Sequence, residues 1–344
     1  MSLRTSGPAR HSDAVVLACD ANHLAIAVCV ALRIDELEVE RRFDLCVCTP
    51  DWQAIPEAWR ELPVRFVEID VARVPAFVHP KAWISVGTFY RHVLPELLAQ
   101  DYARLLYLDT DVHLRRPGLQ GLFDRATGDF AIAAAPDFVA VKAPRKARRR
   151  RSRELVENLG GQGGEYFQAG VLLMQTAQHV AQGLGGRILE FATNQADVLH
   201  QHRLGDQAAL NAVAADLIVP LSPLWNWHSS NWLRREIVEH YDPYILHFTG
   251  PNKPWVIQDD PFVGGLNDAY FACLTRLDPG FKPKTREGSL PWLERHPRYG
   301  FGPADALHRA MRRHRIKRKF GAETSRTIAR YDAMDRLIAS TSIG

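Results

Sequence analysis

Short apolar runs alternate with stretches of helical periodicity along most of the chain. A continuous apolar run that ends at a polar turn predicts a buried strand, and apolar residues three or four positions apart predict a helix. The predicted strands are Val15–Cys19, Phe43–Thr49, Val64–Ile69, Leu105–Leu108, Phe130–Ala134, Val171–Met174, Leu217–Leu221 and Tyr244–Phe248. The predicted helices are Leu24–Leu37, Thr88–Leu98, Arg187–Ala196, Asp206–Ala214 and a basic one near Leu307–Phe320.

Strands that alternate with helices predict an α/β fold, in which helices flank a mostly parallel sheet. In such sheets, ligands bind outside the carboxyl ends of the strands. Asp20 and Asp109 both fall at such ends, so we expect the binding site there. The periodic pattern weakens after about residue 280, which predicts a folded domain at residues 12–280 and a basic C-terminal extension at 281–344.

The composition is that of an ordinary globular protein, with 46% hydrophobic and 24% charged residues. The longest apolar run, Leu24–Leu32, is far shorter than the ~20 residues that cross a membrane. The N-terminus has no apolar segment typical of a secretory signal, so we expect a cytoplasmic protein. The cysteines are five in number and have no zinc-site spacing, so we expect buried thiols at Cys19, Cys29, Cys46, Cys48 and Cys273.

The net charge of +4 conceals two basic segments. Residues 142–153 carry +8 and residues 282–320 carry +9, so the remaining residues carry −13. Nucleic-acid-binding proteins usually have a basic folded surface, so this distribution argues against a nucleic-acid partner. Basic patches on an acidic protein instead favour an anionic surface or an anionic substrate.

Two carboxylates leave the fourth predicted strand in the sequence Leu106-Tyr107-Leu108-Asp109-Thr110-Asp111. Because residues two apart project to the same side of a strand, Asp109 and Asp111 can hold one hard cation. The alternative is that they only cap a turn.

A second segment, Leu246-His247-Phe248-Thr249-Gly250-Pro251-Asn252-Lys253, has the residue types that bind a metal-bound diphosphate. His247 can bind the cation, while the Gly250 amide and the Lys253 ammonium can contact phosphate oxygens. The alternative is a buried histidine beside a solvated lysine.

Two further polar groups have both a functional and a structural interpretation. Asp206 and Gln207 begin a predicted helix, where an aspartate can serve as the N-cap or can act on a substrate. Asp20, Asn22 and His23 can bind a nucleobase and ribose or can simply form a turn.

Taken together, these segments resemble glycosyltransferase family 8, which comprises retaining sugar-nucleotide transferases such as glycogenin and bacterial lipopolysaccharide galactosyl- and glucosyltransferases. LYLDTDV is similar to the family's D-x-D strand end, YFQAGVLLM to its YFNAGVLL segment, GDQAALN to its DQD.LN helix, and LHFTGPNKPW to its H..G..KPW signature. The similarity runs from about residue 14 to residue 256 and implies a GT-A fold.

The resemblance implies a UDP-hexose donor, with galactose or glucose as the sugar, and Mn²⁺ or Mg²⁺ held by Asp109, Asp111 and His247. It implies a donor site formed by Asp20, Asn22, His23, Arg91, Asp109, Thr110, Asp111, Gln168, His247, Gly250 and Lys253. Asp206 and Gln207 would then be the catalytic residues. Two positions depart from the family pattern: His23 stands where a tyrosine commonly stacks on uracil, and Gln168 replaces the usual asparagine.

The acceptor implied by the resemblance is a glycan or glycolipid of bacterial surface-glycan synthesis. We expect the basic extension to bind an anionic membrane surface peripherally, through Arg309, Arg312, Arg313, Arg315, Lys317, Arg318 and Lys319. One alternative is a glycogenin-like protein that glucosylates itself, and a second is a nucleotide- or nucleic-acid-binding module without enzymatic activity.

Overall fold

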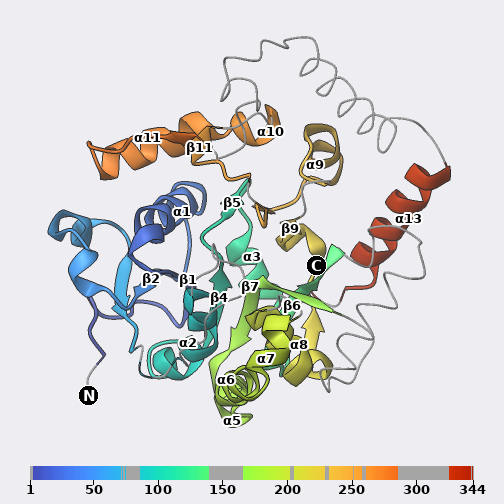
Figure 1. The fold of residues 1–344 in the computed structure, drawn as a ribbon, viewed down its shortest axis with the longest axis horizontal. Coiled ribbons are helices and arrows are strands. Elements are labelled where there is room, and N and C mark those ends of the chain that lie inside the picture. Colours follow the sequence, from blue (N-terminus) through green and yellow to red (C-terminus); the bar gives the residue numbers. More distant parts are fainter. Residues whose placement is uncertain are drawn as a thin grey trace.

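A seven-stranded sheet forms the centre of the molecule (Figure 1). The structure is a computed structural model that describes residues 3–70, 72, 74, 86–138, 166–201, 205–228, 232–250, 252–257, 261–285, 325–341 and 343. The strand order is β3-β2-β1-β4-β7-β6-β8, and all neighbouring pairs are parallel except those of β7 with β4 and β6. The strands are β1 (Asp13–Ala18), β2 (Asp44–Thr49), β3 (Arg65–Glu68), β4 (Arg104–Leu108), β6 (Ile132–Pro136), β7 (Phe167–Gln175) and β8 (Ile218–Pro220).

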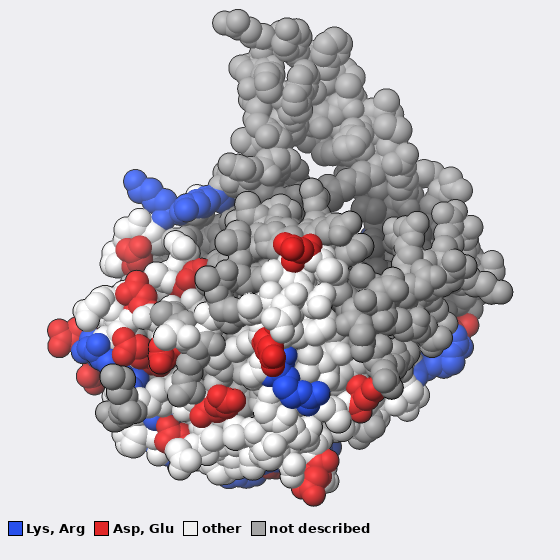
Figure 2. Space-filling view, turned by 60° about the horizontal axis from the view of Figure 1, so that its bottom comes forward, with Lys and Arg blue, Asp and Glu red and all other residues white. Residues whose placement is uncertain are grey.

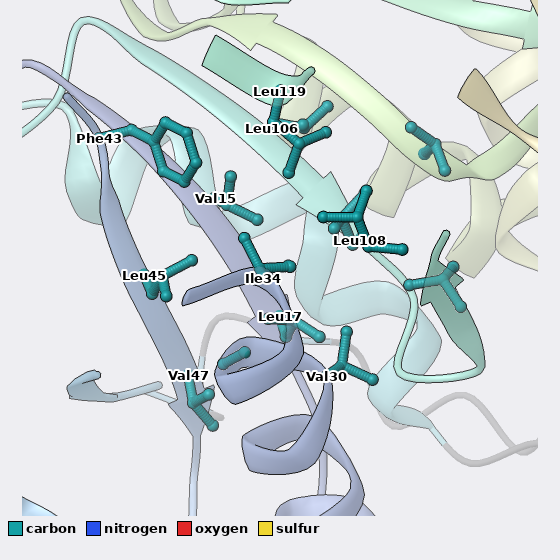
Figure 3. Close-up of a cluster of buried hydrophobic side chains, with 14 of the residues drawn as sticks. Val15, Leu17, Val30, Ile34, Phe43, Leu45, Val47, Leu106, Leu108 and Leu119 are labelled. Atoms are coloured by element: carbon teal, nitrogen blue, oxygen red, sulfur yellow. The ribbon is translucent and has the colours of Figure 1, made fainter. Parts of the chain in front are cut away.

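Helices cover both faces of this sheet, as the sequence predicts. The principal helices are α1 (Leu24–Leu37), α2 (Tyr90–Leu98), α3 (Leu119–Arg125), α5 (Thr176–Ala181), α6 (Leu184–Asn194), α7 (Ala196–Gln201), α8 (Asp206–Ala214), α9 (Arg235–Tyr241), α10 (Pro261–Gly264), α11 (Asn267–Leu277) and α13 (Ser325–Ala339). Alternate residues of β1 face opposite sides. Val15 and Leu17 pack with α1 and α3 (Figure 3), whereas Ala14 and Val16 pack in the cluster that contains α2, α6 and α8.

Two small sheets complete the strand pairing of the described residues. One has the order β5-β10-β9, formed by β5 (Val112–Leu114), β10 (Ile245–His247) and β9 (Trp227–His228). The other pairs β11 (Val256–Ile257) with β12 (Lys284–Thr285). The first of these sheets matters for function, because β5 follows β4 after a short turn and pairs with β10.

The predicted helices Leu24–Leu37 and Asp206–Ala214 are confirmed residue for residue, and the eight predicted strands are confirmed within a few residues. The boundary error is largest at β7, which begins at Phe167 rather than Val171. The pattern did not predict the helices α3, α5, α7, α9, α10, α11 and α13. The basic helix expected near 307–320 and the basic stretch 142–153 lie outside the described residues.

The expectation of five buried thiols is wrong for two cysteines. Cys29 of α1 and Cys273 of α11 form a disulfide, with their Cα atoms 6.0 Å apart. The sequence separation of 244 residues hid this pair, because only the packing of α11 on α1 brings the two together. Cys19, Cys46 and Cys48 are free and buried, as expected. Burial raises the pKa of the Cys46 thiol to about 12, which makes it a poor nucleophile.

The end of the chain returns to the main body. Met334 of α13 is fully buried in a cluster with Trp232 and Leu246, and the Tyr241 hydroxyl bonds Oδ1 of Asp335 at 3.0 Å. The predicted division at residue 280 remains a prediction, because most of the segment between β12 and α13 lies outside the described residues.

The described surface carries charges of both signs. On the face shown in Figure 2, acidic side chains are scattered among uncharged ones, and basic side chains stand singly or in small groups. No helix in the described ranges is long and apolar enough to cross a lipid bilayer.

Candidate active site

Three strands deliver their ends to one edge of the molecule. Leu17 of β1 pairs with Leu108 of β4, so the turns that follow these strands begin side by side. The turn after β4 is fixed by its backbone on two sides: the Asp109 N–H donates to the Gly170 carbonyl at 2.8 Å, and the Phe248 N–H donates to the Asp111 carbonyl at 2.8 Å. His247 of β10 pairs with Val112 of β5, which places its ring next to Asp111.

The structure brings Asp109, Asp111 and His247 together. One ligating atom from each lies within 4.8 Å of the others. Nε2 of His247 is 3.0 Å from Oδ1 of Asp111 and 3.5 Å from Oδ2 of Asp109. The ring is 1% exposed, whereas the two carboxylates keep about a fifth of their side-chain surface open. Two carboxylates and one imidazole with access from one side fit a divalent cation such as Mn²⁺.

Lys253 adds a positive charge to this cluster, next to Asp111. Its Nζ lies 2.5 Å from Oδ2 of Asp111 and donates to the Phe248 carbonyl at 2.6 Å. Burial alone would raise the pKa of Asp111, but Lys253 and His247 together lower it well below its usual value. Asp111 is therefore a carboxylate across the neutral range. Among the described residues, a Cβ at Gly250 would meet no atom within 4 Å. The fold itself does not require this glycine, which leaves room for a ligand.

Arg91 is buried next to the cluster, between two carboxylates. Its guanidinium contacts Oδ1 of Asp109 at 2.9 Å and Oδ2 of Asp206 at 3.1 Å, and it donates to the Ala169 carbonyl at 2.5 Å. The residue is 3% exposed and its guanidinium also lies over the Tyr107 ring. Burial would lower the pKa of Arg91, but the two carboxylates raise it. Arg91 therefore joins the two candidate acidic centres, one at the cation site and one at the start of α8.

The structure excludes the interpretation of Asp206 as an N-cap. The N-cap of α8 is Gly205, and Asp206 is the first helical residue, 6% exposed and directed at Arg91 and His92. Burial would raise the pKa of Asp206, but Arg91 and His92 lower it, so the residue is ionised. A buried carboxylate without a capping role is a candidate for electrostatic catalysis.

Gln207 and Gln168 each accept a hydrogen bond from the backbone of β7. Oε1 of Gln207 accepts from the Ala169 N–H at 3.3 Å, and Nε2 of Gln207 contacts Oδ2 of Asp137 at 3.3 Å. Gln168 is 7% exposed, and its Oε1 accepts from the Gly170 N–H at 2.5 Å. Thr110 is half-buried in the turn between β4 and β5.

The turn Asp20–His23 is less constrained. Asp20 caps a short 3-10 helix (Ala21–His23): its Oδ1 accepts from the Asn22 N–H at 3.0 Å and lies 3.4 Å from Nδ1 of His23. Asn22 is exposed, and 45% of the His23 side-chain surface is open. The turn interpretation is therefore correct for the local geometry, and nucleotide binding by these residues stays a prediction.

Sequence reasoning missed three residues that hold the cluster in place. Asn226 is fully buried and bonds Nδ1 of His247 at 2.8 Å, Tyr107 donates its hydroxyl to Asp109 at 2.8 Å, and His92 contacts Asp206. Tyr107 and His92 each adjoin a predicted site residue or lie two positions from one, which was the available signal. Asn226 lies in a short segment whose only sequence cue is an asparagine between two tryptophans.

Comparison with known proteins now gives this geometry a family. Residues 14–258 match the family model described as Glycosyl transferase family 8. General stress protein A of Bacillus subtilis is 26% identical over 210 residues, which are 56% of this chain and 67% of that protein. Lipopolysaccharide glucosyltransferase WaaO of Escherichia coli is 24% identical over 198 residues, 56% of this chain and 55% of that protein. Lipopolysaccharide 1,3-galactosyltransferase of Salmonella typhimurium is 25% identical over 191 residues, again about half of each chain.

Solved structures show the same fold. Galactosyltransferase LgtC, in complex with donor and acceptor sugar analogs, superposes with a TM-score of 0.56 at 21% identity and covers 81% of this chain and 100% of its own. The apo structure of the bifunctional glycosyltransferase WbbM gives a TM-score of 0.56 at 19% identity, with 78% of this chain and 51% of its own covered. The architecture is therefore the GT-A fold. The chain belongs to glycosyltransferase family 8 and is related to bacterial lipopolysaccharide glucosyl- and galactosyltransferases.

Proposed function

We propose that the protein transfers a hexose from UDP-galactose or UDP-glucose to a glycan or glycolipid acceptor, with retention of the anomeric configuration and with Mn²⁺ or Mg²⁺ as cofactor. We assign the reaction to the synthesis of lipopolysaccharide or another bacterial surface glycan. The convergence of Asp109, Asp111 and His247 within 4.8 Å, at the edge where the fold binds ligands, carries this proposal.

The leaving group would be the UDP diphosphate, whose departure builds negative charge. A cation held by the three residues would supply Lewis-acid stabilisation of that charge. Lys253 adds a second positive charge beside Asp111, and the open backbone at Gly250 allows phosphate oxygens to approach. The exposed groups of Asn22 and His23, at the neighbouring strand end, would contact the ribose and uracil.

At the sugar, the arrangement favours same-face attack over a covalent intermediate. Gln207 is an amide and a weak nucleophile, and its side chain is already bonded to Ala169 and Asp137. Asp206 is ion-paired with Arg91, which lowers its nucleophilicity but leaves it a fixed negative charge near a developing oxocarbenium ion.

The acceptor and the location of the enzyme rest on the sequence. The basic segments at 142–153 and 307–320 would contact an anionic glycan core and the cytoplasmic face of a membrane, respectively, and both lie outside the described residues. Sedimentation with anionic and neutral liposomes at low and high salt tests the membrane part. Equal, salt-independent partitioning between the two liposome types contradicts it.

The decisive experiment is a donor screen. Purified protein is incubated with Mn²⁺ and a panel of nucleotide sugars, and UDP release is measured with and without a chelator. Release from a UDP-hexose that stops with the chelator supports the proposal, whereas full release in excess chelator contradicts the metal dependence. Intact mass spectrometry without acceptor detects the glycogenin-like alternative, because added hexoses would appear on the protein itself.

A further inference from the structure

A chain of hydrogen bonds leads from the backbone of β7 to the ring of His247. The Gly170 N–H donates to Oε1 of Gln168 at 2.5 Å, Nδ2 of Asn226 donates to the same Oε1 at 2.6 Å, and Oδ1 of Asn226 lies 2.8 Å from Nδ1 of His247. We propose that Gln168 and Asn226 are positioning residues that hold Nε2 of His247 toward the two carboxylates. This inference rests on the proposed cation site.

The direction of every bond in this chain follows from one backbone amide. The Gly170 N–H can only donate, so the atom of Gln168 that it meets must be the oxygen. That oxygen has a second lone pair and lies 2.6 Å from the Asn226 amide, so the Asn226 atom that faces it must be the amino nitrogen, the only end of the amide that donates. The amide of Asn226 is thereby fixed with its oxygen toward His247. An amide oxygen only accepts, so Nδ1 of His247 must carry a proton.

A proton on Nδ1 decides what the other nitrogen can do. Nε2 is the atom that lies 3.0 Å from Asp111 and 3.5 Å from Asp109. With Nδ1–H bonded to Asn226, the neutral ring keeps its lone pair on Nε2, and an imidazole binds a metal through such a lone pair. The group that holds the His247 ring is therefore the side-chain amide of Asn226, which is itself held by Gln168.

The three side chains that form these hydrogen bonds are buried. Gln168 is 7% exposed, Asn226 is fully buried and His247 is 1% exposed, so solvent has little access to any of these bonds. The three residues come from different elements: Gln168 from β7, His247 from β10, and Asn226 from the link between the 3-10 helix Pro223–Trp225 and β9. The position at which the family commonly has asparagine thus has, in this chain, a role in the support of the cation site.

The test uses variants that remove or keep the acceptor at residue 168. Gln168→Met preserves length and volume but lacks the oxygen, so Asn226 is free to turn over. Gln168→Glu keeps an oxygen for both donors. The matched control is Asn211→Leu, because Asn211 is a fully buried amide that bonds the backbone of Phe167 on the same strand without contacting His247.

Two measurements are made on the metal-free full chain. Free Mn²⁺ is counted by its electron paramagnetic resonance signal during titration, which gives the affinity. Histidine-labelled protein gives the Nδ1–H signal of His247 by nitrogen-15 NMR, assigned with His247→Gln. We expect Gln168→Met to bind Mn²⁺ about tenfold or more weakly, the usual effect of removing a support of a metal ligand, and to lose the protected Nδ1–H signal.

The remaining outcomes separate this inference from the proposed function. We expect Gln168→Glu to keep the Nδ1–H signal and most of the affinity, and Asn211→Leu to lower the melting temperature while both readouts persist. Unchanged Mn²⁺ affinity and an unchanged signal in Gln168→Met overturn the inference. If the unmodified protein binds no Mn²⁺, the metal dependence of the proposed function fails, and the Nδ1–H signal alone still decides whether Gln168 orients the ring.

Discussion

Two polar groups at neighbouring strand ends of this molecule are built in opposite ways. The cluster after β4 joins Asp109, Asp111 and His247 through contacts between residues that are far apart in the sequence, such as those to Arg91 and Lys253. The turn after β1 forms its side-chain contacts within four residues: Oδ1 of Asp20 accepts from the Asn22 N–H at 3.0 Å and lies 3.4 Å from Nδ1 of His23.

The difference indicates what holds the side chains of each group in position. The cluster is held by the fold before any ligand arrives, which is the preorganisation that electrostatic catalysis needs. The turn is exposed and locally closed, so a bound nucleotide would have to supply part of its order. The cluster after β4 would then control the rate of the chemical step, and the turn after β1 would contribute mainly to the affinity for the donor.

The strongest test of the cluster is Asp111→Asn. This change removes a carboxylate that faces both His247 and Lys253. We expect Mn²⁺-dependent UDP release to fall by on the order of a hundred- to a thousandfold. Asp242→Asn is the matched control, because it removes an exposed carboxylate that pairs with Arg115 and Arg116. The control should keep its turnover, and full activity in Asp111→Asn would reject the site.

A second test adds atoms to the cluster without removing any. A Cβ at Gly170 would overlap the His247 ring and lie 2.6 Å from Oδ2 of Asp109. We expect Gly170→Ala to weaken Mn²⁺ binding and turnover by on the order of a hundredfold, because the ring or the strand must move. Gly186→Ala is its control, since a Cβ there meets no atom of the described part of the chain within 4 Å. Equal Mn²⁺ affinity in the two variants would show that the cluster is not held rigidly.

Asp206 tests whether the two acidic centres have separate roles. Asp206→Asn keeps the size of the side chain but leaves Arg91 paired with Asp109 alone. We expect turnover to fall about a hundredfold, while the Mn²⁺ affinity measured by titration stays within a few-fold of the original. A loss of metal affinity as large as the loss of turnover would mean that Asp206 acts through the cation site.

The turn after β1 should respond more weakly and in a different parameter. His23→Ala removes a half-exposed ring without disturbing the bond from the Asn22 N–H to the Asp20 carboxylate. We expect KM for the UDP-sugar to rise about tenfold, the worth of one stacking contact, with kcat and Mn²⁺ affinity nearly unchanged. A fall in kcat with KM unchanged would place His23 in the chemistry and remove the contrast between the two groups.

The stability of the fold itself depends on pH. This dependence must be known before the activity of the cluster is compared at different pH values. Burial, with a smaller effect of His92, lowers the pKa of His179 from 6.5 to about 3, and the residue is 1% exposed. The unfolded chain therefore binds this proton more readily between pH 6.5 and 3, so stability falls as the pH falls through that window. From pH 7 to pH 6 we expect a loss of about 0.7 kcal/mol, roughly threefold in the folding equilibrium.

Urea unfolding at the two pH values, compared with His179→Gln, measures this contribution. The variant should lose less stability between pH 7 and pH 6 than the original protein does. The same pH dependence in both proteins would show that His179 does not control it.

The sequence was informative wherever a local pattern encodes the structure. The apolar runs predicted the strands that end at Asp20 and Asp109, and the spacing of Asp109 and Asp111 correctly placed both carboxylates on one side. The residue types of the segment 246–253 singled out His247 and Lys253, but only the resemblance to the family joined His247 to Asp109 and Asp111 in one site.

What the sequence could not predict depends on pairings across the chain. Asn226 was missed because its partners, Gln168 and His247, are 58 and 21 residues away. Arg91 was expected to contact the donor, but its burial between two carboxylates is a property of how α2, β4 and α8 pack. The disulfide between Cys29 and Cys273 was missed for the same reason.

The reversed direction of β7 has a consequence for how this fold can change in evolution. Because β7 runs antiparallel to β6, its first residue lies at the edge where β6 ends, and the Asp137 N–H donates to the Tyr166 carbonyl at 2.8 Å. This bond holds Asp137 and Tyr166 side by side at the edge of the sheet that carries the candidate site. Lengthening an insertion costs little free energy once its ends are fixed. Mutation can therefore change the length of the connection between Asp137 and Tyr166 without altering a strand pair, so this connection can diverge while the sheet is inherited unchanged.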